Sequence, residues 1–227
     1  MFDEPSLRAA LADVGYRRVK RHLYRAEWST EIEHFIEFHL YGTPKDYLAA
    51  DFGLRNKEAE TFADRSIKAY GGPWTKLIRY DEQTDFCIRF SLGKLAGSWG
   101  LRSSLTISSM PGPLLAKKVR DDIEQKLFPL IRDVTSLSRF MSLLATDIEP
   151  FAWLYSNAAM RAAMIVSVAQ RLGATPDDVR PLFEPHFKGI AYGISDGRNP
   201  DPRAYIDNIM RDAASRDAPN SMSASRT

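Results

Sequence analysis

The segment 31–41 alternates between two kinds of side chain, and this alternation constrains the fold more than any other feature of the chain. Every second residue belongs to a mostly apolar set: Ile32, His34, Ile36, Phe38 and Leu40. The residues between them form a charged and aromatic set: Glu33, Phe35, Glu37, His39 and Tyr41. Because successive side chains of a strand point to opposite faces of a sheet, the segment predicts one long strand with two different faces.

The rest of the N-terminal half predicts neighbours for this strand. Residues 42–44, Gly-Thr-Pro, suit a turn, and residues 47–54 then form an antiparallel partner. The other elements predicted in this half are helices over 6–14 and 56–70 and strands over 16–25, 74–80, 85–92 and 101–107.

The period of the apolar residues changes after residues 110–113, Met-Pro-Gly-Pro. Two prolines and a glycine interrupt both helices and strands, so they mark a boundary. Beyond it, apolar residues recur every four positions until Pro129 ends or kinks the segment: Leu115, Val119, Ile123 and Leu127. Further helices are predicted over 136–144 and 157–172, from residue 175, and over 201–211.

These elements predict an α+β fold, with an antiparallel sheet in the N-terminal half and helices concentrated in the C-terminal half. We expect residues 1–110 to hold the sheet and two helices. Residues 111–211 are expected to form a helical region that shares the same core, because a lone sheet of this size leaves an apolar face uncovered. Residues 212–227 have no apolar period and are expected to form a disordered tail.

Composition narrows the classes of function. The chain has 227 residues, with 31 basic and 29 acidic side chains and a formal net charge of +2. This balance gives no strong attraction to nucleic acid or to an anionic membrane. The longest nearly apolar stretch, 158–169, is too short to span about 30 Å of hydrocarbon. With no secretory signal at the N-terminus, the chain is expected to be cytoplasmic and to bind no membrane.

The motifs of common enzyme classes are missing from the sequence. No Gly-x-Ser-x-Gly surrounds a serine, and the glycines of residues 93–100 fit neither phosphate-binding pattern. That stretch is expected to be a flexible hairpin or strand crossing. Cys87, the single cysteine, lies within a predicted strand and suits a buried structural role. The sequence therefore predicts no catalytic residue and no cofactor.

The long strand carries a cluster of side chains of the types that bind metals, but strand geometry keeps them apart. Glu33, Glu37 and His39 share one face, whereas His34 points the other way. Residues four apart on a strand are separated by roughly 13 Å, so Glu33 and Glu37 cannot bind one ion. Glu37 and His39, roughly 7 Å apart, would need ligands from another strand. We therefore predict a solvated sheet face and no metal.

The basic side chains that precede this strand suggest a second possibility. Five of them lie among aromatic residues: Arg17, Arg18, Lys20, Arg21 and Arg25. Cations interleaved with aromatic rings are typical of single-stranded nucleic-acid binding. Acidic residues of the neighbouring segment, among them Glu27 and Glu33, are expected to neutralise much of this charge across the strands. Nucleic acid is therefore not expected as a partner.

The charged and aromatic face of the long strand is the remaining candidate. Glu33, Phe35, Glu37, His39 and Tyr41 combine aromatic rings, which dominate binding hot spots, with acidic groups, which steer basic partners. The alternative is that the C-terminal helices cover this face and that its aromatic residues are simply part of the core.

The order of several short motifs resembles a group of small bacterial α+β domains of unknown function, of the kind found among toxin-immunity proteins. The motifs are Gly15-Tyr16-Arg17-Arg18, Leu23-Tyr24-Arg25 and Leu127-Phe128-Pro129-Leu130-Ile131. The resemblance covers residues 5–145 and implies an α+β fold without assigning catalytic residues. By analogy, it implies a partner protein, such as a toxin encoded nearby.

Two functions remain open at this point. The favoured one is a non-enzymatic protein-binding module, an immunity or adaptor-type protein that masks its partner. The other is a hydrolase-like or metal-dependent enzyme that uses His34 or His39 with Glu37 or Asp51. A pocket with converging imidazole and carboxylate groups would favour the enzyme, and a flat aromatic face would favour the binding module.

Overall fold

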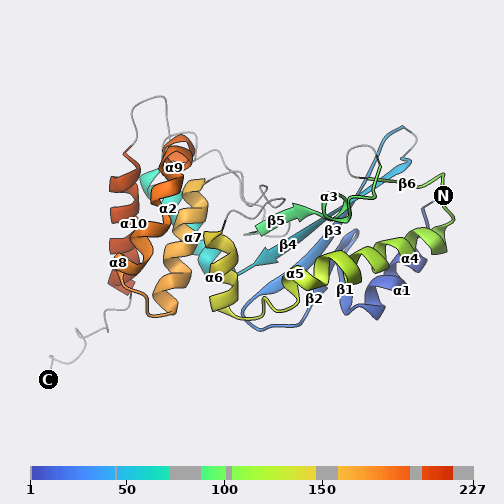
Figure 1. The fold of residues 1–227 in the computed structure, drawn as a ribbon, viewed down its shortest axis with the longest axis horizontal. Coiled ribbons are helices and arrows are strands. Elements are labelled where there is room, and N and C mark those ends of the chain that lie inside the picture. The colour runs from blue at the N-terminus through green and yellow to red at the C-terminus, as the bar shows by residue number, and fades with distance from the viewer. Residues whose placement is uncertain are drawn as a thin grey trace, which may run out of the picture. The chain divides into compact units, whose positions relative to one another are not determined.

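The fold is α+β, as the sequence predicts (Figure 1). The computed structural model describes residues 2–43, 45–71, 88–100, 104–146, 158–194 and 201–216. The chain divides into two compact units. The sheet unit comprises residues 1–56 and 83–154, and the helical unit comprises residues 57–82 and 155–227.

An antiparallel sheet forms the centre of the sheet unit. Its strands follow one another in chain order: β1 (Tyr16–Lys20), β2 (Leu23–Ala26), β3 (Glu33–Tyr41), β4 (Tyr47–Arg55) and β5 (Ile88–Ser91). A short β6 (Leu105–Thr106) also pairs with β4. The predicted long strand and its hairpin partner are thus confirmed as β3 and β4. The strand predicted over 74–80, the start of that over 85–92, and Cys87 lie outside the described residues.

The alternation of β3 places its two sets of side chains as predicted. On one face Ile36 and Phe38 are 0% and 2% exposed. His34 lies on the same face, and its ring nitrogen is 2.9 Å from the carbonyl oxygen of Val134. Trp28 contacts the His34 ring edge-on and also the ring of Phe128. The segment 128–134 therefore lies against the apolar face of the sheet, because it contacts the residues of that face.

Helices complete the core on this side. α1 (Glu4–Asp13) begins at Asp3, whose side chain accepts a hydrogen bond from the backbone of Ser6, and it packs against β1 and α4 (Gly112–Asp122). Figure 1 shows α1, α4 and α5 (Phe128–Ile131) gathered alongside the strands. α6 (Leu137–Ala145) follows in the same unit. Its N-cap is Ser136, which agrees with the helix start predicted at residue 136.

The four-residue repeat after residue 113 is accommodated by a wide helical turn. A step of four residues in an α-helix overshoots one turn by about 40°, so a long repeat of this kind drifts around the helix. Residues Ile123–Leu127 form a π-helical turn, η3, which takes back part of that drift. Ile123 and Leu127 are both fully buried. Pro129 does not end the segment, because the chain continues through it in α5, which follows the π-helical turn directly.

The glycine-rich stretch differs from the prediction. Residues expected to form the end of a strand and then a flexible hairpin instead form a short helix, α3 (Leu92–Ala96). Ser91 accepts a hydrogen bond from the backbone N–H of Lys94, and Gly97 ends the helix with a φ of +66°, a conformation that favours glycine. Leu92 is fully buried. Strand alternation does not reveal a local side-chain cap, so this helix was missed.

The helical unit is built around α7 (Ala158–Arg171), whose residues are buried on nearly every side. α2 (Lys57–Tyr70), α9 (Phe187–Ile194) and α10 (Pro202–Arg216) all pack against α7. α8 (Pro176–Val179) begins directly after Thr175, the predicted N-cap, which forms a capping box with Asp178. Two 3₁₀ turns follow it, η4 (Arg180–Leu182) and η5 (Glu184–His186).

The last helix is longer than predicted. α10 continues to Arg216, whereas the sequence placed its end near residue 211 and the tail from 212. Asp212 accepts a hydrogen bond of 2.7 Å from the Tyr70 hydroxyl, and Ala213 is 3% exposed. These contacts keep residues 212 and 213 in the helix, although the sequence there has no apolar period. The boundaries of the two units also differ from the boundary predicted at residue 110. That the whole chain shares one core stays a prediction. No described helix has the length and apolarity needed to cross a membrane.

Candidate binding face

The charged and aromatic set of β3 lies opposite the face that contacts Val134 and Phe128. We call this side of the sheet the mixed face. Antiparallel pairing brings side chains of neighbouring strands beside the β3 residues: Leu23 pairs with Glu37, Glu37 with Asp51, and Tyr41 with Tyr47. The mixed face is therefore assembled from several strands, although the sequence identified it from one.

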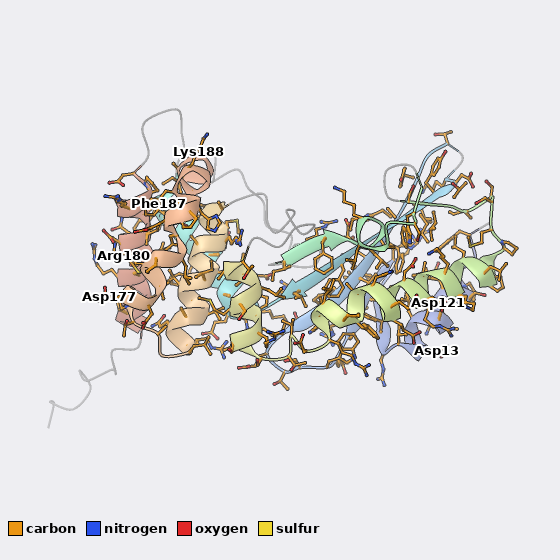
Figure 2. The ribbon with its side chains drawn as sticks, viewed as in Figure 1. Asp13, Asp121, Asp177, Arg180, Phe187 and Lys188 are labelled. Carbon is orange, nitrogen blue, oxygen red and sulfur yellow. The ribbon has the colours of Figure 1, made fainter. Side chains whose placement is uncertain are left out.

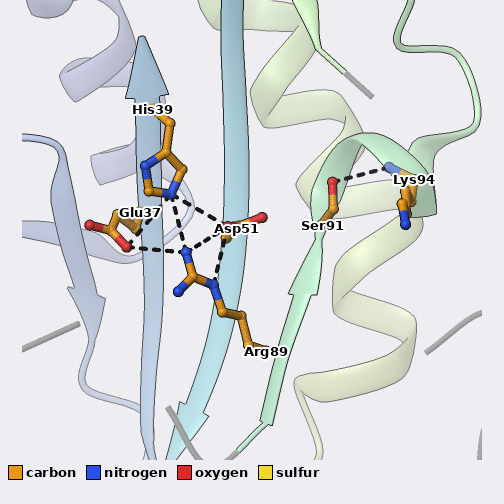
Figure 3. Close-up of polar contacts among 6 residues, drawn as sticks. All are labelled: Glu37, His39, Asp51, Arg89, Ser91 and Lys94. Carbon is orange, nitrogen blue, oxygen red and sulfur yellow. Dashed lines mark hydrogen bonds and ion pairs between the residues drawn. The ribbon is translucent and has the colours of Figure 1, made fainter. Parts of the chain in front are cut away.

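Four of its residues form a charged cluster, shown in Figure 3: Glu37, His39, Asp51 and Arg89. The Arg89 guanidinium donates to Asp51 Oδ2 from Nη2 at 2.7 Å and from Nε at 3.1 Å. Nη2 also lies 3.6 Å from Glu37 Oε2 and 3.3 Å from His39 Nε2. His39 Nε2 in turn is 3.4 Å from Asp51 Oδ2 and 3.6 Å from Glu37 Oε2.

The strand register explains how these groups meet. Glu37 on β3 pairs directly with Asp51 on β4, and Asp51 pairs with Ser91 on β5. Arg89 pairs with Gly53, which has no side chain, so the long arginine side chain reaches diagonally to Asp51. His39 is two residues from Glu37 on the same face of β3. Three adjacent strands thus contribute to one cluster.

The cluster shifts the ionisation of two of its members. The hydrogen bond to Asp51, together with the charges of Glu37 and Asp51, raises the pKa of His39 above its ordinary value, against the effects of burial and of the Arg89 charge. Burial raises the pKa of Asp51, but hydrogen bonds from His39 and Arg89 and the charge of Arg89 outweigh burial and lower it. Asp51 is therefore the carboxylate that interacts more strongly with Arg89 and His39, and it also lies closer to both than Glu37 does.

Asp51 of β4 places a third side chain of a metal-ligand type close to Glu37 and His39. The prediction made from a single strand did not include it. The space between these three side chains is filled by Nη2 of Arg89, a cation that is already part of the protein. Glu33 lies apart and pairs with Arg25 at 3.3 Å. Across the described part of the chain, no three or more histidine, cysteine or acidic side chains are grouped so as to hold a metal ion.

Exposure differs among the five predicted contact residues. The side chain of His39 is 39% exposed, whereas those of Glu37 and Glu33 are 16% and 19% exposed. Phe35 is 5% exposed and packs with Leu23 beneath the surface, so it supports the face without forming its contact surface. Tyr41 stacks on Tyr47, with ring centroids 5.4 Å apart and an interplanar angle of 21°.

His34 is separated from the mixed face and lies in the core. It is fully buried, and its Nε2 bonds to the Val134 carbonyl oxygen. Burial lowers its pKa to about 4, against the hydrogen bond to Val134, so the imidazole is neutral at pH 7. Of the two histidines considered for an enzyme, only His39 lies beside carboxylates.

The basic run is neutralised in part as predicted. Arg25 pairs with Glu27 at 2.9 Å and with Glu33 at 3.3 Å. Arg18 pairs at 3.1 Å with Glu4, an acidic residue of α1 that the strand argument did not consider. A helix packed beside the sheet can therefore supply counter-charges that cross-strand pairing does not.

Two open hollows lie elsewhere in the sheet unit. The larger, about 680 Å³, is lined by eight residues: Arg25, Ala26, Glu27, Trp28, Ser29, Thr30, Glu33 and Thr135. The smaller, about 480 Å³, is lined by Glu4, Pro5, Arg8, Ala9, Ala12 and Arg18. Neither hollow is lined by a residue of the charged cluster.

Arg89 is the functional candidate that sequence reasoning missed. It alternates with Ile88 and Phe90 in the predicted strand 85–92, and this was the available signal that its side chain faces away from the core. The pattern did not say which strand lies next to it, so Asp51 was not recognised as its partner. Comparisons with family models, with curated proteins and with solved structures found no match to this chain.

Proposed function

We propose that this chain is a protein-binding module, an immunity or adaptor-type protein that masks a partner in the cytoplasm, and that it binds through the mixed face. The observation that carries the proposal is a partly exposed charged cluster that shares one side of the sheet with a stacked tyrosine pair. The other side is contacted by the segment 128–134, through the bond between His34 and the Val134 carbonyl oxygen and the ring contact between Trp28 and Phe128.

The physical properties of the face support this function. Tyr41 and Tyr47 are held in one orientation by stacking, so a partner that contacts them loses little side-chain entropy on binding. Each charged group of the cluster already has an internal counter-charge, which lowers the cost of removing it from water. A rigid aromatic pair beside a paired charge cluster is therefore suited to contact with another protein.

The test is direct binding to candidate partners. Products of the adjacent genes are purified, and their affinity for the full chain is measured by isothermal titration calorimetry. For the partner that binds, Tyr41→Ala is expected to weaken the affinity about tenfold, because truncating a central aromatic residue costs more than about 1 kcal/mol.

Two variants serve as matched controls. Tyr41→Phe keeps the ring and should retain the affinity. Lys188→Ala changes an exposed residue of the helical unit (Figure 2) and should have no effect. Unchanged affinity in Tyr41→Ala would show that a partner binds elsewhere.

A second candidate function is supported by one observation. His39 Nε2 lies 3.4 Å from Asp51 Oδ2, and a carboxylate in this position can orient an imidazole whose other nitrogen, Nδ1, acts as a base. This supports a hydrolase-like enzyme using His39 with Asp51 and Glu37. Turnover of simple ester or phosphoester substrates that is lost in His39→Ala would favour it. Absence of turnover in the wild-type chain would reject it for these substrates.

A further inference from the structure

The Nε2 atom of His39 lies between one donor and two acceptors. Arg89 Nη2, at 3.3 Å, carries only hydrogens and can only donate. Asp51 Oδ2 and Glu37 Oε2, at 3.4 and 3.6 Å, can only accept when ionised. Nε2 either carries a proton or presents a lone pair, so it can satisfy the arginine or the carboxylates but not both at once.

Protonation selects between the two arrangements, because only the neutral ring with its proton on Nδ1 can accept from Arg89. When His39 is neutral with its proton on Nδ1, the Nε2 lone pair accepts from Arg89. When His39 is protonated, Nε2–H donates to Asp51 or Glu37, and the imidazolium repels the guanidinium beside it. Arg89 keeps both of its hydrogen bonds to Asp51, at 2.7 Å from Nη2 and 3.1 Å from Nε, so the contact that it loses is the one with the ring.

We propose that His39 and Arg89 form a proton-operated switch on the mixed face, in which protonation of His39 exchanges its contact with Arg89 for contacts with the carboxylates and removes the negative charge that the cluster otherwise presents to a partner. This inference rests on the proposed function, because it assigns a regulation to the same face. Partner binding and protonation of His39 at the same site influence each other reciprocally, so we expect the affinity for the partner to change with pH.

The charges around His39 favour such a switch. Among the described residues, the charged groups that act on it are Glu37 from its own strand, Asp51 from β4 and Arg89 from β5. With neutral His39 these groups sum to one negative charge, and protonation brings the cluster to neutrality. The carboxylates outweigh Arg89, so the pKa of His39 lies above 6.5, the ordinary value for histidine. The side chain is 39% exposed, which lets the proton exchange with solvent.

Nuclear magnetic resonance of the full chain tests the switch without a partner. The histidine Cε1–H and arginine Nε–H signals are followed from about pH 5 to pH 9. We expect the Arg89 signal to shift with the same midpoint as His39. Arg25 is the internal control, because it pairs with Glu27 and Glu33 and its signal should stay constant through that midpoint.

Three variants sharpen the result. His39→Gln should abolish the Arg89 shift. Asp51→Asn should lower the His39 midpoint further than Glu37→Gln, because the hydrogen bond to Asp51 is the largest single cause of the raised pKa. The His22 signal serves as a reference in the same titration, and its midpoint should lie below 6.5, because burial and Arg21 lower the pKa of His22.

The outcomes separate this inference from the proposed function. An Arg89 signal that does not follow His39, or a His39 midpoint that Asp51→Asn leaves unchanged, overturns the switch even if a partner binds. A switch that behaves as expected while Tyr41→Ala leaves partner affinity unchanged overturns only the binding role of the face.

Discussion

At the scale of single residues, His34 is a titratable side chain held in the core of the sheet unit. It is fully buried among aromatic rings, with Trp28 at a centroid distance of 4.9 Å and Phe52 at 6.2 Å. One ring nitrogen bonds to Val134, and the other, Nδ1, has no hydrogen-bond partner among the described residues. Protonation at this position would place an uncompensated charge in the core.

His34 is therefore expected to make the protein less stable as the pH falls. Its pKa is about 4 in the folded chain and near 6.5 when unfolded, so the unfolded chain binds the proton first. The contribution to stability is complete above pH 6.5 and is lost progressively down to about pH 4, by about 3 kcal/mol. The check is the free energy of unfolding in urea, measured across this pH range.

The comparison with His34→Phe isolates this contribution. Phenylalanine keeps an aromatic ring in the core but cannot bind a proton, so its stability should fall less between pH 6.5 and 4. A difference between the two proteins is needed because His39 acts in the opposite direction. Its raised pKa adds stability below pH 6.5 that is lost as the pH rises through its folded value. Equal losses in both proteins would contradict the role of His34.

At the scale of elements, the π-helical turn η3 keeps two apolar side chains that are four residues apart, Ile123 and Leu127, in the core. Leu127 at the end of η3 is fully buried, whereas Leu130, three residues later in α5, is 36% exposed. Leu127→Ala is expected to lower the free energy of unfolding by about 2–5 kcal/mol, because it leaves a cavity. Leu130→Ala should change it by less than about 1 kcal/mol. Chemical denaturation of both variants checks this, and similar losses would show that the turn does not orient the helix as described.

The elements that the sequence predicted correctly are those with a regular period. The alternation of β3 and the four-residue repeat before Pro129 report directly on which side of an element is buried. The charged cluster could not be predicted from such a period, because its members lie on different strands, up to 52 positions apart in the chain, from Glu37 to Arg89. Which strands pair, and in which register, is decided by contacts distant in sequence. A pattern within one strand does not contain that information.

The same reasoning explains the two errors at element ends. α3 is set by the Ser91 cap and by Gly97, which act locally and leave no apolar period. The last turn of α10 is held by Tyr70 and Gln170, which contact Asp212 and the carbonyl oxygen of Ala213. Those partners lie far away in the sequence. A polar segment was therefore read as a tail although tertiary contacts stabilise it as helix.

At the scale of the whole molecule, the chain buries two sets of apolar side chains. In the sheet unit these include Ile36, Phe38 and Leu127, and in the helical unit they include Ile165 and Ile209. The helical unit is discontinuous in sequence, since α2 precedes β5 and the other helices follow residue 154. Its folding therefore depends on a segment inserted between strands of the sheet unit.

Hydrogen exchange of the full chain shows whether these sets are cooperative. Ile209→Ala removes a fully buried side chain of α10 and is expected to destabilise its surroundings by about 2–5 kcal/mol. If each unit unfolds on its own, amide protection falls in α2, α7, α9 and α10, while β3 and β4 keep theirs. Arg211→Ala, an exposed change in the same helix, is the control and should leave both units unchanged. An equal loss of protection in β3 and β4 would instead support one core shared by the whole chain, because local damage spreads only through a common cooperative unit.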